Sequence, residues 1–344
     1  MSATLLEIQR MSTEDGPGIR TTVFFKGCTL ACTWCHNPES ISPKKEVVWH
    51  DYKCIGCQTC VTTCPERALS LTSKGVFVED DRCVACGTCT SECPTTAREE
   101  LGSKWEVDDL VHEVAKDRTW FETSGGGVTA SGGEPCLQAH FVADFFARCR
   151  ELDIPVALDT CGMCSEERLL KVARLADLVL FDLKEIDSEA HQQFTGQPNE
   201  RILENAVAVA SLVKETGAGF WIRTPLIPGA TATRDNISGI GQFIAKNLGD
   251  QVQRWELCSF NNLCQKKYSR LGLEWAFAEA ELPAEDQQAL YETARNSGVD
   301  PAIVVLTGPQ NSCLTPGPTG SVGRDSSTEN LCFESASVAL RPRI

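Results

Sequence analysis

The sequence predicts an α/β fold, in which helices cover a mostly parallel sheet and one small cysteine-rich segment interrupts the pattern. Two observations support this prediction. Short β-branched and aromatic runs alternate with helical patterns, which is typical of βαβ units around a parallel sheet. Between positions 46 and 101 this alternation stops, and two near copies of one cysteine pattern follow each other.

The expected strands are rich in apolar, β-branched and aromatic residues, and they cover 22–25, 128–130, 156–158, 178–183, 220–224 and 255–260. The helices expected between them cover 107–116, 141–152, 166–175, 202–215 and 237–248. A final helix at 284–296 and a final strand at 302–306 complete the series. In a βα barrel, functional groups gather at the C-terminal ends of the strands. The residues that follow each strand are therefore the first candidates for a site.

Composition and charge exclude several classes of function. The chain has 344 residues and a formal net charge of −15. Such an acidic chain lacks the basic surface that nucleic-acid binding requires. We find no apolar stretch of bilayer length and no signal peptide at the N-terminus. The sequence therefore predicts a cytoplasmic protein, in which clustered members of the 19 cysteines are metal ligands rather than disulfides.

Three cysteines directly after the first expected strand are the strongest chemical signal. Cys28, Cys32 and Cys35 follow the spacing C-x3-C-x2-C, and no fourth cysteine lies nearby in the sequence. A cubane iron–sulfur cluster is normally held by four thiolates, so three ligands leave one iron open. A catalytic metal site keeps such an open position. The alternative is a zinc knuckle, with His36 as the adjacent fourth ligand.

The cysteine-rich segment contains the pattern C-x2-C-x2-C-x3-C-P twice, at Cys54, Cys57, Cys60 and Cys64 and again at Cys83, Cys86, Cys89 and Cys93. These runs resemble bacterial ferredoxins with two clusters, in which the fourth cysteine of each run ligates the other cluster. The resemblance implies one cluster on Cys54, Cys57, Cys60 and Cys93, and a second on Cys83, Cys86, Cys89 and Cys64. A segment this short cannot bury enough apolar surface alone, so the clusters would act as its core. Zinc is again the alternative.

The loop of Cys28, Cys32 and Cys35 resembles that of radical S-adenosylmethionine (radical SAM) enzymes. Two segments beside this loop point to one group of these enzymes. They resemble the signature of glycyl-radical enzyme activating enzymes, and they are Asp15-Gly16-Pro17-Gly18-Ile19-Arg20 and Trp34-Cys35-His36-Asn37-Pro38-Glu39. This resemblance implies a partial (β/α)6 barrel built from residues 1–45 and 102–310. Residues 46–101 would form a small inserted ferredoxin-like domain with two 4Fe–4S clusters, and 311–344 a flexible tail.

The resemblance also implies an oxidoreductase. Reductive cleavage of S-adenosylmethionine (SAM) would give methionine and a 5′-deoxyadenosyl radical, which takes a hydrogen atom from a glycine Cα of a partner protein. The implied cofactors are SAM and three 4Fe–4S clusters, one that binds SAM and two auxiliary clusters. The implied partners are a glycyl-radical enzyme and a low-potential electron donor such as flavodoxin or ferredoxin. We expect a monomer that binds neither nucleic acid nor a membrane.

Residues at two other strand ends are expected to contact SAM. Gly132 and Gly133 would let backbone carbonyls approach the methionine ammonium, and Glu134 would add a charge-assisted hydrogen bond. Asp182 and Lys184 lie at positions i and i+2, which share one face of a strand. The resemblance implies that both contact the ribose or the methionine part of SAM.

Further contacts to SAM follow from the resemblance alone. Arg223 is expected near the SAM carboxylate, which its planar guanidinium suits. Trp34 and His36, beside the cysteines, are expected at the same site. Many family members carry a histidine after the last strand, where this chain has Asn261, whose amide can hydrogen-bond but cannot ionise.

Two weaker expectations concern a cation and the partner. Asp159 and Thr160 resemble a pair that binds a monovalent cation in some members, although the third side-chain position is the apolar Leu180. Asp15, in the N-terminal signature, is expected to contact the glycine loop of the partner.

Two other functions remain open. The chain could be a radical SAM enzyme whose auxiliary clusters serve a peptide or small-molecule substrate, or a ferredoxin fused to an inert barrel. Because pyruvate formate-lyase activating enzymes are expected to lack the inserted segment, the resemblance favours activators of other glycyl-radical enzymes. These include diol dehydratases, choline or isethionate lyases, aryl-acetate decarboxylases and alkylsuccinate synthases.

Overall fold

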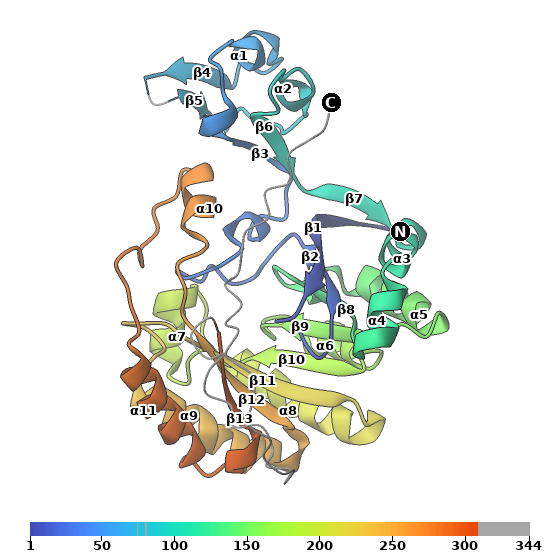
Figure 1. Ribbon diagram of the computed structural model, residues 1–344, viewed down its shortest axis with the longest axis vertical. Coiled ribbons are helices and arrows are strands. Elements are labelled where there is room, and N and C mark those ends of the chain that lie inside the picture. Colours follow the sequence, from blue (N-terminus) through green and yellow to red (C-terminus); the bar gives the residue numbers. More distant parts are fainter. Residues whose placement is uncertain (74, 80, 309–344) are drawn as a thin grey trace, which may run out of the picture.

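The computed structural model describes residues 1–73, 75–79 and 81–308, so the predicted tail at 311–344 lies outside the described residues. A nine-stranded sheet has the order β13-β12-β11-β10-β9-β8-β2-β1-β7 (Figure 1). Its parallel strands are β2 (Arg20–Phe25), β8 (Gly127–Gly132), β9 (Val156–Thr160), β10 (Leu178–Asp182), β11 (Gly219–Leu226), β12 (Arg254–Ser259) and β13 (Val304–Thr307). The antiparallel strands β1 (Ser2–Ser12) and β7 (Ser103–Glu106) form the other edge.

Helices lie along the outside of this curved sheet (Figure 1). They are α3 (Val107–Ala115), α4 (Arg118–Ser124), α5 (Ala139–Glu151), α6 (Glu166–Ala173), α7 (Ser188–Thr195), α8 (Glu200–Thr216), α9 (Arg234–Phe243) and α11 (Ala284–Arg295). The short helix α10 (Gln265–Arg270) lies apart from them, toward the inserted segment. The core between sheet and helices contains fully buried aromatic side chains, among them Phe145, Phe146, Phe181, Phe220 and Trp255. One face of these strands packs against the helices and is apolar. The other face also carries charged residues, among them Asp159, Arg223 and Glu256.

The α/β part of the predicted fold class is confirmed, since the sheet is mostly parallel and consistent with a partial barrel. Every expected strand of the main sheet is present, with β13 at Val304–Thr307 instead of 302–306. The helix expected at 237–248 begins earlier, as α9 at Arg234, and ends in a π-helical turn at Ile244–Leu248. The N-terminal strand β1 has no counterpart in the sequence prediction.

The cysteine-rich segment leaves the sheet after β3 (Glu46–Trp49) and returns through β6 (Arg98–Leu101), which pairs with β3 in an antiparallel ribbon. Beyond the ribbon lie a hairpin of β4 (Leu69–Thr72) and β5 (Gly75–Val78), and two short helices, α1 (Thr59–Thr63) and α2 (Thr88–Ser91). The small core of this segment includes cysteine side chains as well as apolar ones. Figure 1 shows it standing apart from the sheet, at the top of the molecule.

The base of the ribbon is anchored to the main sheet by a buried lysine. Lys26 follows β2, and its Nζ donates to Oε2 of Glu46 (2.8 Å) and to the carbonyl of Glu39 (2.6 Å). On the return path only Gly102 separates β6 from β7, and a Cβ there would lie 2.7 Å from Cδ of Lys26. Both ends of the segment therefore meet the sheet at this lysine.

Among the described residues, no helix combines the length and the apolar character that a bilayer crossing requires.

Candidate active site

The three-cysteine loop, residues 28–35, leaves the end of β2 and is held on two sides by backbone hydrogen bonds. The Cys28 N–H donates to the Ile41 carbonyl (3.0 Å), and the Ala31 N–H donates to the carbonyl of Thr195 at the C-terminus of α7 (2.8 Å). The Thr29 hydroxyl donates to a third segment, at the Met163 carbonyl (2.7 Å). Two of these three anchors, Met163 and Thr195, lie more than a hundred residues away from the loop in the sequence.

All three thiols of this loop are half-buried and free of disulfides. Burial raises the pKa of Cys32 to about 11 and that of Cys35 to about 12. Contact with the Cys161 thiol lowers the pKa of Cys28. At neutral pH Cys32 and Cys35 are therefore protonated. The thiolate is the metal-binding form, so they lose their protons when a cation such as iron binds.

The glycine pair at the end of β8 lets the backbone pack directly against the three-cysteine loop. The Gly133 N–H donates to the Phe25 carbonyl (2.9 Å), and the Glu134 N–H donates to the Gly27 carbonyl (2.7 Å). A Cβ on Gly133 would lie 2.1 Å from the Gly27 oxygen, and Gly132 has a φ of +113° that L side chains rarely adopt. Both positions therefore require glycine for the approach of the two strand ends.

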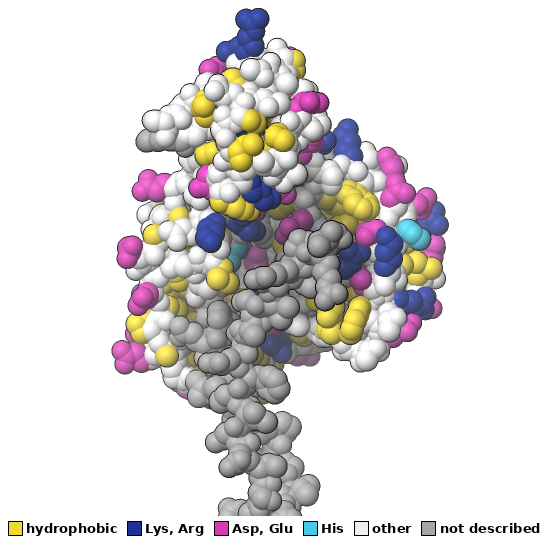
Figure 2. All heavy atoms as spheres, turned by 45° about the horizontal axis from the view of Figure 1, so that its top comes forward, with side chains coloured by type: hydrophobic (Ala, Val, Ile, Leu, Met, Phe, Trp, Pro, Cys, Tyr) yellow, Lys and Arg dark blue, Asp and Glu magenta, His cyan; other side chains and the backbone are white. Residues whose placement is uncertain are grey.

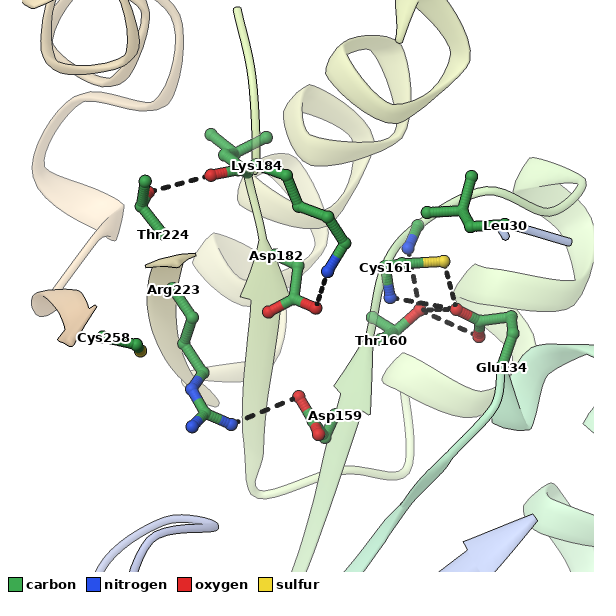
Figure 3. Close-up of polar contacts among 12 residues, drawn as sticks. Leu30, Glu134, Asp159, Thr160, Cys161, Asp182, Lys184, Arg223, Thr224 and Cys258 are labelled. Atoms are coloured by element: carbon green, nitrogen blue, oxygen red, sulfur yellow. Dashed lines mark hydrogen bonds and ion pairs between the residues drawn. The ribbon is translucent and has the colours of Figure 1, made fainter. Parts of the chain in front are cut away.

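The Glu134 carboxylate is fully buried and is surrounded by donors of the protein itself (Figure 3). The N–H groups of Cys136 and Cys161 donate to it at 2.9 Å each, and the Thr160 hydroxyl donates at 2.8 Å. The Cys161 thiol also donates, at 3.1 Å. Glu134 thus ties the end of β8 to the end of β9, a role that the sequence prediction did not include.

The predicted pair Asp182 and Lys184 shares one side of the site (Figure 3). Lys184 Nζ donates to Oδ2 of Asp182 at 2.6 Å, and both side chains are largely buried. Burial alone would lower the pKa of Lys184, but the charges of Asp182, Cys32 and Cys161 outweigh it and raise the pKa. The ammonium group is therefore a fixed positive charge close to the three-cysteine loop.

A network of charged groups lines the neighbouring strands. Arg223, on β11, has Nη1 3.6 Å from Oδ1 of Asp159 and Nε 3.3 Å from Oε2 of Glu256, and its Nη2 donates to the Glu14 carbonyl at 3.3 Å. Burial alone would lower its pKa, but Cys258, Asp159 and other acidic groups raise it. The Nε atom is buried and makes no hydrogen bond among the described residues, although it lies within ion-pair distance of Glu256. Arg223 is therefore a fixed positive charge at this end of β11.

Asp159 and Thr160 do not converge on one place. The Asp159 carboxylate accepts a hydrogen bond from the Ser131 hydroxyl (2.5 Å) and faces Arg223, whereas the Thr160 hydroxyl donates to Glu134. Neighbouring residues of a strand point to opposite faces, which explains the divergence. Burial raises the pKa of Asp159 to about 7, against the opposing effect of Arg223.

The three remaining residues expected at the SAM site lie where α10 meets the three-cysteine loop. His36 hydrogen-bonds the backbone of Asn261, and burial lowers its pKa. Trp34 is buried in an aromatic cluster with Tyr268, and its ring centroid lies 5.8 Å from that of Phe194. The segment after β12 thus folds back over the cysteines and brings Asn261 next to His36.

Asp15 is half-buried and is already hydrogen-bonded within the protein. Its Oδ2 accepts from the hydroxyl groups of Ser12 (2.5 Å) and Thr22 (2.6 Å), and its carbonyl accepts from Thr129 (2.8 Å). These bonds fix the loop between β1 and β2, which ends at Ile19. Glu14 on the same loop contacts Arg223 as described above.

Two cavities in the inserted segment group its eight cysteines. One cavity is lined by Cys54, Cys57, Cys60 and Cys93, and the other by Cys64, Cys83, Cys86 and Cys89. These are the two sets of four to which the sequence interpretation assigned one cluster each. The fourth cysteine of each run has crossed to the other cavity.

Sequence reasoning missed three residues of the site, namely Cys161 beside Cys28, Cys258 beside Arg223, and Tyr268 beside Cys35. Both cysteines belong to the set that had been read as scattered structural thiols. Their positions directly after β9 and within β12 are the one signal that could have identified them.

Comparison with known proteins agrees with this geometry. The family model of the radical SAM superfamily matches residues 22–235. The trans-4-hydroxy-L-proline dehydratase activating enzyme of Clostridioides difficile is 41% identical over 288 residues, which are 83% of this chain and 94% of that protein. The (2S)-3-sulfopropanediol dehydratase activating enzyme of Klebsiella oxytoca is 36% identical over 79% of this chain and 86% of its own length.

A third relative is named for a pyruvate formate-lyase. The pyruvate formate-lyase 2-activating enzyme of Escherichia coli is 36% identical over 302 residues, covering 88% of this chain and 92% of that protein. The expectation that pyruvate formate-lyase activating enzymes lack the inserted segment stays a prediction.

Proposed function

Because this chain belongs to the radical SAM superfamily, and within it to the activating enzymes of glycyl-radical enzymes, we propose that Cys28, Cys32 and Cys35 hold the cluster that binds SAM. The observation that carries this proposal is one anchored loop with three half-buried free thiols beside a fixed lysine charge. When bound, the cluster supplies the electron that splits the sulfonium of SAM, and the resulting radical takes hydrogen from a glycine Cα of a partner. The partner is a glycyl-radical enzyme.

The chain's own residues position SAM. Backbone carbonyls at the end of β8, beside Gly132 and Gly133, accept hydrogen bonds from the methionine ammonium. Arg223 presents its guanidinium charge to the SAM carboxylate. Asp182 and Lys184 bind the ribose or the methionine part from β10. The adenosyl part of SAM lies against Trp34, His36 and Asn261.

Glu134 serves this site indirectly. Its carboxylate oxygens already accept hydrogen bonds from three backbone and side-chain partners, so they have little capacity left for a ligand. We infer that Glu134 positions the ends of β8 and β9, and through Cys161 the ligand Cys28. Asp15, on the loop that contacts Arg223, faces the glycine loop of the partner.

The inserted segment holds one 4Fe–4S cluster in each of its two cavities and passes electrons to the SAM cluster. Cys57 and Cys86, one in each cavity, are exposed, so each cluster would lie within reach of a docked donor such as flavodoxin or ferredoxin. Figure 2 shows hydrophobic side chains on this end of the molecule, where Tyr52, Ile55 and Val84 are exposed. Ile55 and Val84 each follow the first cysteine of a run.

The decisive experiment is anaerobic. The full chain is reconstituted with iron and sulfide, reduced with dithionite, and given SAM, and 5′-deoxyadenosine is quantified. Wild type should form 5′-deoxyadenosine, and the triple variant Cys28→Ser, Cys32→Ser, Cys35→Ser should form none. The control Cys149→Ala removes a buried thiol of α5, away from the site, and should retain activity.

A candidate glycyl-radical enzyme then tests the partner. With it present, electron paramagnetic resonance should detect a glycyl radical on the partner. Formation of 5′-deoxyadenosine without any glycyl radical on a panel of such enzymes would favour the alternative, a radical SAM enzyme that modifies a peptide or small molecule.

A further inference from the structure

The two halves of the inserted segment have the same local structure. After each fourth cysteine comes a residue in the left-handed region, Arg67 (φ 50°) in the first half and Thr96 (φ 54°) in the second. The following alanine is buried in both halves and donates its N–H to that cysteine's sulfur, at 3.4 Å for Ala68 and 3.2 Å for Ala97. The next residue is Leu69 in the first half and Arg98 in the second. These two residues occupy equivalent positions with different chemistry.

Each of these two residues lines one of the cavities. Leu69 lines the cavity of Cys64, Cys83, Cys86 and Cys89, and Arg98 lines the cavity of Cys54, Cys57, Cys60 and Cys93. Arg98 is 3% exposed, and its three guanidinium nitrogens are buried without a hydrogen-bond partner among the described residues. No carboxylate within the described residues forms an ion pair with it. A buried cation without an anion is strongly disfavoured. We therefore expect a negatively charged group beside Arg98.

A second donor in the same cavity points to the same conclusion. Trp49 pairs with Arg98 across the β3–β6 ribbon, and its indole N–H is also buried without a partner. The ring fits only because residue 75 is glycine, since a Cβ there would lie 2.0 Å from Cη2 of Trp49. The residues that line the other cavity include no such unpartnered buried side-chain atom. The residues around one cavity thus include unpartnered buried donors and those around the other do not, although the charge of Arg98 also opposes the rise that burial causes in the pKa of Cys89, in the second cavity.

We propose that Arg98 supplies the charge that compensates the cluster on Cys54, Cys57, Cys60 and Cys93, and that it makes this cluster easier to reduce than the one beside Leu69. The proposal rests on the proposed function, in which both cavities hold clusters. A cluster with four thiolates carries net negative charge, which increases by one on reduction. A buried positive charge therefore favours the reduced form, and burial protects this interaction from screening by salt.

The proposal has a consequence for electron transfer. One electron from a low-potential donor would reside preferentially on the cluster beside Arg98. The two inserted clusters would then act as unequal steps, although their cysteine ligands follow the same spacing. The cysteine spacing alone does not show this difference in reduction potential. The difference arises because the equivalent positions hold leucine in the first half and arginine in the second.

The test is a potentiometric titration followed by electron paramagnetic resonance. It uses the full-length Cys28/Cys32/Cys35→Ser chain, so that only the inserted clusters contribute. In this background Arg98→Leu makes the second half match the first. Arg98→Lys keeps the charge. Arg67→Asn removes an exposed charge from the same segment, and asparagine tolerates the left-handed backbone there. Iron content is measured for every variant.

Arg98→Leu should make the reduction equilibrium of one cluster at least tenfold less favourable, which is a shift of about 59 mV to lower potential for one electron. Arg98→Lys should retain most of the wild-type potential, and Arg67→Asn should change little. Equal potentials in the Arg98→Leu and Arg67→Asn variants, at unchanged iron content, would overturn the proposal. Loss of one cluster's iron in Arg98→Leu but not in Arg98→Lys would support charge compensation, whereas loss in both would overturn it.

The same measurement separates this proposal from the proposed function. If the background chain contains no cluster iron at all, the assignment of two clusters to the cavities fails, whatever residue 98 does. If it contains two clusters whose potentials do not respond to residue 98, the clusters remain and only the role of Arg98 fails.

Discussion

Replacing Glu134 by alanine is expected to destabilise the fold by several kcal/mol. The carboxylate accepts hydrogen bonds from two backbone N–H groups, of Cys136 and Cys161, and from the Thr160 hydroxyl. Each buried donor left without an acceptor costs about 1–3 kcal/mol. Because neighbouring effects are not fully additive, the three donors together predict a loss of about 3–6 kcal/mol in the free energy of unfolding.

Two milder variants should lose less stability than Glu134→Ala. Glu134→Gln keeps one acceptor oxygen and should lose about 1–3 kcal/mol. Thr160→Val removes one donor while both backbone N–H groups keep their acceptor, so it should lose about 1–2 kcal/mol. Urea-induced unfolding of the iron-free chain, followed by far-ultraviolet circular dichroism, measures all three changes, and SAM binding is measured in parallel on the reconstituted protein.

The reasoning would be refuted by one combination of results. If Glu134→Ala stays within about 0.5 kcal/mol of wild type, which is typical of an uncritical position, while SAM affinity falls sharply, then Glu134 contacts the ligand and does not hold the strand ends.

Three further changes test other parts of the site. Gly133→Ala places a Cβ 2.1 Å from the Gly27 oxygen, so about one cluster's share of iron should be lost from the three-cysteine loop, while the inserted clusters keep theirs; unchanged total iron would contradict this. Lys184→Met leaves Asp182 without its cation and removes a charged donor, so the yield of 5′-deoxyadenosine should fall about ten- to hundredfold; a wild-type yield would exclude a role in binding. Burial raises the pKa of Asp159 to about 7, so the folded chain holds this proton more tightly than the unfolded chain, and the stabilisation present below about pH 4 is lost as pH rises through 7. Asp159→Asn should therefore flatten the melting temperature of the iron-free chain across this range, and an unaltered slope would assign the pH dependence to other groups.

Much of the architecture could be predicted because each parallel strand buries an apolar face against the helices. The run Leu178–Phe181 of β10 carries that signal locally, and the helices show amphipathic faces. The strand β1 was missed because it lies at the antiparallel side of the sheet, where polar residues such as Glu7 and Gln9 alternate with buried ones. The four-residue strands of the insert are too short for any periodicity to be read.

The site was predicted where the chemistry resides in a local motif and missed where it depends on long-range packing. The proximity of Asp182 and Lys184 follows from strand geometry alone. The contact between Cys161 and Cys28 depends on how β9 lies relative to β2, which no local pattern records. Likewise, Arg98 and Leu69 are visible as a difference between two repeats, but only burial shows that the arginine lacks an anion.

The ribbon of β3 and β6, anchored at Lys26, has a consequence for the speed of internal electron transfer. Tunnelling rates fall steeply with the distance between redox centres, so a flexible tether would make each transfer wait for a favourable encounter. Here hydrogen-bonded strands leave and rejoin the main sheet at one buried, ion-paired lysine, which opposes hinge motion of the insert. The gap that electrons cross is then a fixed length of the fold. Internal reduction should consequently proceed at a rate that does not depend on solvent viscosity.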